Sequence, residues 1–122
     1  MVVLNAQLPE FLILRHEDVR TSGIPDISIN GLKRTSWLEV KHADPTIDLH
    51  PELQELTCRR VARKSFYCRY LVYFENGNGL KRTMLIHPDN IHSMSPDQWT
   101  VGFDHRWVAE CLRKVHSSRA GA

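Results

Sequence analysis

The chain has few cysteines and no long apolar run. Its three cysteines, Cys58, Cys68 and Cys111, are odd in number and form no C-x-x-C pair, so we expect buried or free thiols in a reducing compartment. No apolar segment approaches the roughly 20 residues that cross a bilayer, and the first residues lack the basic and apolar regions of a signal peptide. These absences predict a cytosolic protein with no membrane partner.

A strong charge of either sign is also missing. The net charge is +2 over 122 residues, which is compatible with nucleic-acid binding but does not argue for it. The hydrophobic share of 42% and the charged share of 25% are typical of one globular domain with a single modest core. The glycines fit neither phosphate-loop pattern, and the nucleophile elbow of serine hydrolases is absent.

The strongest local pattern is a β-hairpin. Two β-rich runs, 26–30 and 36–41, flank the turn signal Asn30-Gly31. Because side chains alternate along a strand, a two-residue turn at Asn30-Gly31 or at Leu32-Lys33 puts Asp26, Glu39 and Lys41 on one face. The later turn sets Asp26 directly opposite Glu39, and the earlier one separates them by two pairs.

Two carboxylates on one face repel each other unless a cation lies between them. Hard oxygen ligands suit Mg²⁺ or Mn²⁺, which bind through one or two carboxylates plus a substrate phosphate. A lysine beside such an ion can orient or help deprotonate the attacking water and offset the charge that builds on phosphorus. The pattern therefore predicts a metal-dependent phosphodiesterase.

The pair Pro25-Asp26, followed by Glu39-Val40-Lys41, resembles the signature of the PD-(D/E)XK nuclease superfamily. The lead-in Gly23-Ile24-Pro25-Asp26, the Asn30-Gly31 turn and Gln54 on the next expected helix are most similar to its VRR-NUC branch, which is related to Holliday junction resolvases. The resemblance covers about residues 11–74. It implies an α/β fold of the restriction-endonuclease type, in which a central mixed sheet of four or five strands is flanked by helices.

The resemblance also implies the roles of the residues. Asp26, Glu39 and the Val40 carbonyl would hold Mg²⁺ or Mn²⁺, Lys41 would position and activate water, and Gln54 would face the active site. The product would carry a 5′-phosphate. Cores of this superfamily open with a helix that bears a further glutamate, and only about ten residues precede the first strand here. Glu10 and Glu17 are the candidates for that ligand, although a short helix and a polar loop explain them as well.

The remaining elements follow from periodicity. We expect strands at 11–15, 67–74 and 80–86, a helix at 51–64 with the apolar stripe Leu53, Leu56 and Val61, a short helical turn from Ser95, and a last helix from Asp104 to about His116. One domain therefore covers 1–122, with a core at about 11–92 and a helical extension at about 95–117. Arg59, Arg60, Arg63 and Lys64 on the first helix are either a phosphate-binding patch or a solvated face.

The sequence analysis thus predicts a structure-selective, metal-dependent endonuclease that acts on duplex or branched DNA. Two alternatives remain: a non-catalytic nucleic-acid-binding or assembly module with a nuclease-like fold, and a transposase-type end-nicking subunit. We also expect a homodimer, because one metal site cuts one strand and a two-fold pair of sites matches antiparallel DNA. The stripe of Trp107, Val108, Cys111 and Leu112 on the last helix is either part of that contact or core.

Overall fold

One mixed sheet organises the chain. The structure, a computed structural model, describes residues 6–16, 25–43 and 52–117, with the backbone alone at 52–55. Its six strands are β1 (Leu12–Arg15), β2 (Ile27–Asn30), β3 (Thr35–Ala43), β4 (Tyr67–Glu75), β5 (Lys81–Ile86) and β6 (Gln98–Val101). They lie side by side in chain order, and every neighbouring pair is antiparallel except β3 and β4.

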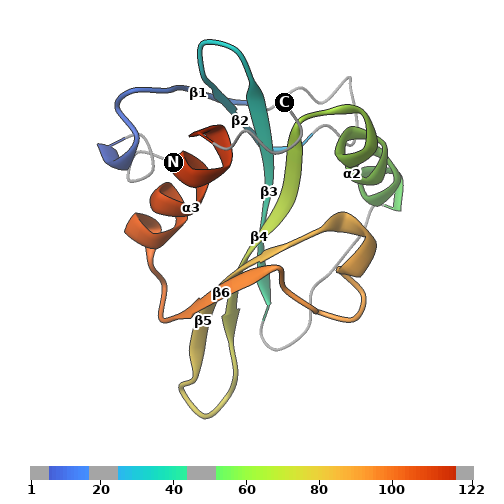
Figure 1. The fold of residues 1–122 in the computed structure, drawn as a ribbon. Coiled ribbons are helices and arrows are strands. Elements are labelled where there is room, and N and C mark those ends of the chain that lie inside the picture. The colour runs from blue at the N-terminus through green and yellow to red at the C-terminus, as the bar shows by residue number, and fades with distance from the viewer. Residues whose placement is uncertain (1–5, 17–24, 44–51, 118–122) are drawn as a thin grey trace.

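The parallel pair is joined by a helical crossover, which makes the fold α/β. Helix α2 (Glu52–Lys64) connects β3 to β4, a 3₁₀ turn η1 (Pro88–Asn90) follows β5, and helix α3 (His105–Ser117) ends the described chain. Figure 1 shows α3 and α2 on opposite sides of the central strands. The mixed sheet flanked by helices, with a further helix at the C-terminal end, was predicted from the sequence.

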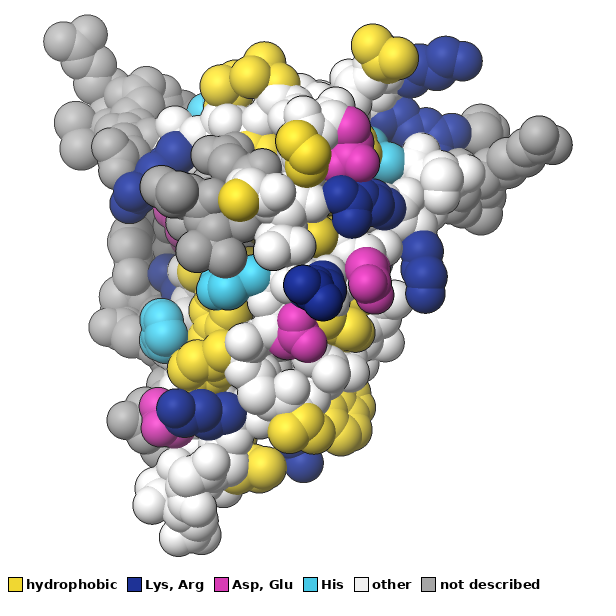
Figure 2. All heavy atoms as spheres, turned by 90° about the vertical axis from the view of Figure 1, so that its left-hand side faces the viewer, with side chains coloured by type: hydrophobic (Ala, Val, Ile, Leu, Met, Phe, Trp, Pro, Cys, Tyr) yellow, Lys and Arg dark blue, Asp and Glu magenta, His cyan; other side chains and the backbone are white. Residues whose placement is uncertain are grey.

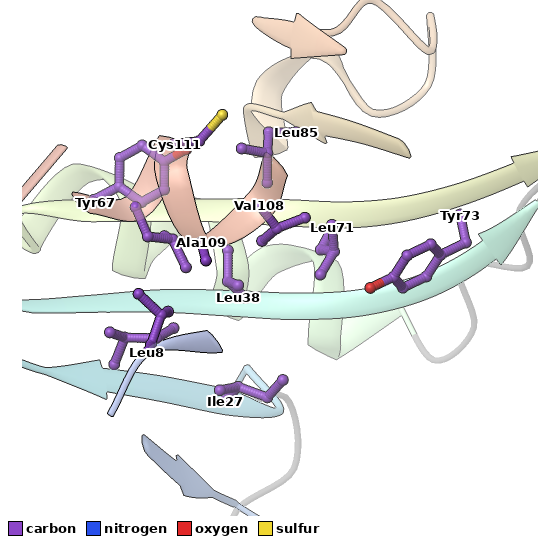
Figure 3. Close-up of a cluster of buried hydrophobic side chains, with 12 residues drawn as sticks. Leu8, Ile27, Leu38, Tyr67, Leu71, Tyr73, Leu85, Val108, Ala109 and Cys111 are labelled. Atoms are coloured by element: carbon purple, nitrogen blue, oxygen red, sulfur yellow. The ribbon is translucent and has the colours of Figure 1, made fainter. Parts of the chain in front are cut away.

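Each face of the sheet has its own core, and alternation along the strands decides which residues enter which one. On the α3 side, Leu38 and Leu71 from β3 and β4 pack with Val108 and Leu112 of α3 (Figure 3). On the α2 side, Cys58 packs against a cluster of strand residues that includes Tyr70 and Val72. The three cysteines are buried and free, as expected.

The predicted strands and the two long helices agree with the structure to within about two residues. The helical turn expected from Ser95 is wrong, because the chain there leads into a sixth strand, β6, which pairs with β5. Asp97 starts this pairing by donating its backbone N–H to the Leu85 carbonyl (2.9 Å), while its carboxylate accepts from Arg69 Nε (2.7 Å). Sheet pairing therefore overrides a local capping pattern.

The apolar stripes of the helices differ in how well they were predicted. In α2, Leu56 is 51% exposed, and Cys58 makes the core contact instead. In α3, Asp104 caps the first turn by accepting the Trp107 N–H (2.9 Å), and the predicted stripe packs on the sheet of its own chain. The stripe is therefore core, and the dimer contact considered for it is not supported. None of the helices described is long and apolar enough to span a membrane.

Candidate active site

Asp26 and Glu39 face each other across β2 and β3. The pairing of Ile27 with Leu38 continues outward to Asp26 and Glu39, which is the register of a two-residue turn at Leu32-Lys33. The Gly31 N–H closes that turn by donating to the Arg34 carbonyl (2.9 Å). Of the two registers open to the sequence, the later turn is therefore correct, and the two acids are direct neighbours.

Each carboxylate is held by a backbone group of the opposite strand. Glu39 Oε1 accepts a hydrogen bond from the Asp26 N–H (2.9 Å), and Asp26 Oδ2 accepts one from the Val40 N–H (3.1 Å). These two bonds lock the carboxylates in place, because one oxygen of each side chain is tied to the other strand. The remaining oxygens are the ones that can face a ligand.

Glu39 is the most deeply buried acid of the site. Its side chain is 1% exposed, and its Oε2 atom accepts no hydrogen bond from any described residue. Burial first, and then the neighbouring Asp26 carboxylate, raise the pKa of Glu39 to about 7. A buried acceptor without a donor costs free energy, so Oε2 marks a place where a cation would be stabilised.

Lys41 supplies the positive charge next to this acid. Its Nζ lies 3.6 Å from Glu39 Oε2, and its side chain is 19% exposed. Since residues 39 and 41 share a face of β3, both side chains project to the side of the sheet that α2 covers. A single lysine offsets the charge of only one of the two carboxylates, so a divalent ion would stabilise the pair further.

A cavity of about 310 Å³ lies under Asp26 on the α3 side of the sheet. Its wall includes Arg15, Tyr73 and His105, and the Tyr73 hydroxyl forms a hydrogen bond of 2.9 Å with His105 Nδ1. Burial raises the pKa of Tyr73 to about 12, so the hydroxyl stays protonated at neutral pH. The Tyr73–His105 pair was not predicted from the sequence, in which its only signal is a histidine directly after the capping Asp104.

The other predicted site residues are dispersed. Glu10 forms a bidentate pair with Arg113 (3.0 Å to Nη2 and 3.1 Å to Nε) near the hairpin turn, so it does not reach Asp26 at the other end of β2. Glu17 lies outside the described residues. Gln54 is in the first turn of α2, four residues before the buried Cys58, and its side chain is not described.

The basic residues of α2 lie along its outer surface. Arg60, Arg63 and Lys64 are exposed, and Arg59 is partly buried with its Nε 4.0 Å from Asp89 Oδ1. Arg63 and Lys64 occupy the last turn, where positive side chains also stabilise the helix end. The helix therefore presents a basic face, as its sequence predicts. Stabilisation of the helix end is sufficient to explain the positive charge at Arg63 and Lys64.

The residues present fit a divalent cation held by two carboxylates. Asp26 and Glu39 are locked next to each other, and Glu39 Oε2 is buried without a hydrogen-bond donor among the described residues. A third His, Cys, Asp or Glu does not join them within the described part of the chain. This donor set suits an ion such as Mg²⁺, which keeps several waters.

Comparison of the chain with protein-family models, with curated proteins and with solved structures finds no match. The geometry of the Asp26–Glu39–Lys41 cluster is therefore the basis of the functional argument.

Proposed function

We propose that this protein is a metal-dependent endonuclease that hydrolyses DNA phosphodiester bonds. The observation that carries the proposal is the Asp26–Glu39 pair, two locked carboxylates with Lys41 Nζ 3.6 Å from the buried Glu39 Oε2. The order of elements supports it as well, because an antiparallel hairpin followed by a parallel β3–α2–β4 unit is compatible with a restriction-endonuclease-like core.

In this proposal Asp26, Glu39 and the Val40 carbonyl hold Mg²⁺ or Mn²⁺, which supplies Lewis-acid activation of phosphate and water when bound. Lys41 Nζ positions the attacking water and donates a hydrogen bond to the phosphate oxygens as negative charge builds on them. Water oxygen bonds to phosphorus as its proton passes to solvent, the P–O3′ bond breaks, and the departing O3′ takes a proton from solvent. The products are a 5′-phosphate and a 3′-hydroxyl.

DNA contacts away from the cleaved bond would come from the exposed face of α2. Arg60, Arg63 and Lys64 lie on the helix that covers the same side of the sheet as Glu39 and Lys41. Contacts between such side chains and phosphates fix position along the backbone but carry little sequence information. We therefore propose selection by DNA structure, duplex or branched, over selection by sequence.

The direct test is a cleavage assay on linear duplex, four-way branched and single-stranded DNA, with Mg²⁺, Mn²⁺ or excess EDTA. We expect cleavage with either metal, the fastest on branched DNA, and none in EDTA or with Glu39→Gln. Full activity in EDTA would refute the metal-dependent mechanism. Tight DNA binding without cleavage under any condition would favour the non-catalytic binding module, and single-strand nicks confined to the neighbourhood of the duplex ends would favour an end-nicking subunit.

A further inference from the structure

A second concave surface lies at the tip of the β2–β3 hairpin, where the hairpin meets the last turn of α3. It is an open groove of about 750 Å³ between Gly31–Arg34, the segment around Phe11, and residues 113–117. Gly31 lies five positions after Asp26, with the four residues of β2 between them, which is roughly 16 Å along an extended strand. The groove is therefore distinct from the carboxylate site, and the proposed cleavage reaction does not use it.

The floor of the groove is aromatic. The rings of Phe11 and His116 lie 4.7 Å apart, and His116 Nε2 is held by a hydrogen bond of 2.9 Å with Ser36 Oγ. A Cβ on Gly31 would lie 3.2 Å from both rings, so the absence of a side chain at this position lets the hairpin tip approach them. Burial and the Arg34 charge lower the pKa of His116, which keeps its ring neutral at neutral pH.

The rim of the groove is basic. Four basic residues line it, Lys33, Arg34, Arg113 and Lys114, against a single acid, Glu10. That acid is already paired with Arg113 (3.0 Å), and the guanidinium of Arg34 is fixed over the Phe66 ring at 4.6 Å. Figure 2 shows several basic side chains at the upper right of the face that it draws, with acidic side chains beside them.

We propose that this groove binds single-stranded nucleic acid, with a base stacked on the Phe11–His116 floor and phosphates held by Lys33 and Lys114. A groove that tracks a backbone with positive charge and offers aromatic rings to unpaired bases is how proteins hold single strands. The bases of a duplex are stacked on each other and cannot use the floor. An acidic peptide would meet the same charges but has no flat rings to place on it.

The first experiment changes the ligand, so folding of the protein is not at issue. Fluorescence anisotropy in EDTA would compare a twelve-residue oligothymidine, its abasic counterpart, a duplex of equal length and poly-glutamate. We expect the oligothymidine to bind about tenfold more tightly than the abasic strand, because one stacked base contributes about that factor. Equal affinity for the oligothymidine and the abasic strand, or tighter binding of poly-glutamate, would overturn the proposal.

The second experiment locates the binding surface. Lys33→Ala with Lys114→Ala should weaken oligothymidine binding about tenfold at low salt and reduce the salt slope by about 1.4, since each single-strand phosphate contact contributes about 0.7. The matched control, Lys81→Ala with Arg106→Ala, removes two exposed charges elsewhere and should leave affinity within twofold. Equal effects of the two pairs would overturn the assignment.

The Asp26→Asn variant separates this proposal from the proposed cleavage. It should lose hydrolysis and keep oligothymidine binding, because the carboxylate site lies at the other end of β2. In EDTA, a change of oligothymidine affinity in Asp26→Asn, in either direction, would show that the strand binds at the carboxylate site and not in the groove.

Discussion

At one end of the β2–β3 hairpin two carboxylates face each other across the strands, whereas at its tip basic side chains surround an aromatic floor. The acidic end is buried, and its charges are fixed by backbone hydrogen bonds. The basic tip is open, and Lys33 and Lys114 there are exposed. Burial of a charged group shifts its pKa and affects the stability of the fold, as it does for Glu39. An exposed charged group acts mainly on partners in solution.

The largest expected effect follows from neutralising one of the two acids at the buried end of the hairpin. Asp26→Asn or Glu39→Gln should lower cleavage by about a thousandfold or more, because each substitution removes the negative charge of one of the two carboxylates that would hold the ion. Each neutral side chain keeps an acceptor for its backbone N–H, so the fold should survive. Circular dichroism and a cleavage assay with Mg²⁺ measure this, and Lys81→Ala, at an exposed position of β5, serves as the control with unchanged turnover.

Substitution of Lys41 tests whether this lysine acts in the cleavage step or only holds the Glu39 carboxylate in place. Lys41→Ala should lower turnover by about 10²–10³-fold with Mn²⁺ affinity nearly unchanged, since the lysine would act on water and on the transition state. Calorimetric titration with Mn²⁺ and single-turnover kinetics separate the two effects. Loss of metal binding in this variant would reassign Lys41 to holding the Glu39 carboxylate, from which it lies 3.6 Å away.

The buried acid should also make stability depend on pH. The pKa of Glu39 rises from its ordinary 4.5 to about 7 on folding, so between these values the folded state binds more protons than the unfolded one. The free energy of unfolding in EDTA should therefore fall by up to about 3 kcal/mol as pH rises through this window. Urea titrations should show this fall in the wild type and not in Glu39→Gln, and equal slopes would contradict it.

The basic face of α2 can be compared with the acidic end and the basic tip of the hairpin. If Arg60 and Arg63 contact duplex phosphates, Arg60→Ala with Arg63→Ala should weaken binding of all DNA sequences alike and flatten the salt dependence by about one unit per contact. Fluorescence anisotropy on two unrelated duplexes measures both quantities. An unchanged salt dependence would mean that these side chains are only solvated and stabilise the end of the helix.

The homodimer stays a prediction, and the substitutions that test it should have the smallest effect on cleavage. The α3 stripe packs on its own sheet, so the edge strands are our candidate contact for a second copy, because Leu12 and Leu14 on β1 and Trp99 and Val101 on β6 are exposed. Light scattering at micromolar concentration should give about twice 14.2 kDa. Leu12→Lys or Val101→Lys should then restore the monomer, and a monomeric wild type would refute the dimer.

Several features of the site were readable in the sequence because they depend only on the period of a strand. Whichever turn is used, Asp26, Glu39 and Lys41 share a face, since both registers have the same parity. The cap at Asp104 and the apolar stripe of α3 are likewise local patterns, and the structure contains both. Local stereochemistry therefore determined which residues gather and on which side of the sheet.

The exact pairing was decided by tertiary contacts. Asn30 stays in β2 because its Nδ2 donates to the Leu12 carbonyl (3.0 Å) and its Oδ1 accepts from Thr35 Oγ1 (2.9 Å), which moves the turn to Leu32-Lys33. That shift makes Asp26 and Glu39 direct neighbours. One hydrogen bond comes from Leu12, 18 residues away in β1, and the other from Thr35 across the turn, so no local propensity of Asn-Gly encodes them.

The sequence by itself therefore determined the hairpin, the face shared by its charged residues and the helix that follows it. The tertiary structure alone decided that Glu10 pairs with Arg113, that Leu56 points to solvent, and that residues 98–101 form a strand. Each of these outcomes depends on which surface of another element lies opposite. Burial and pairing across the sheet contribute more free energy than the weak local preferences on which a sequence pattern rests.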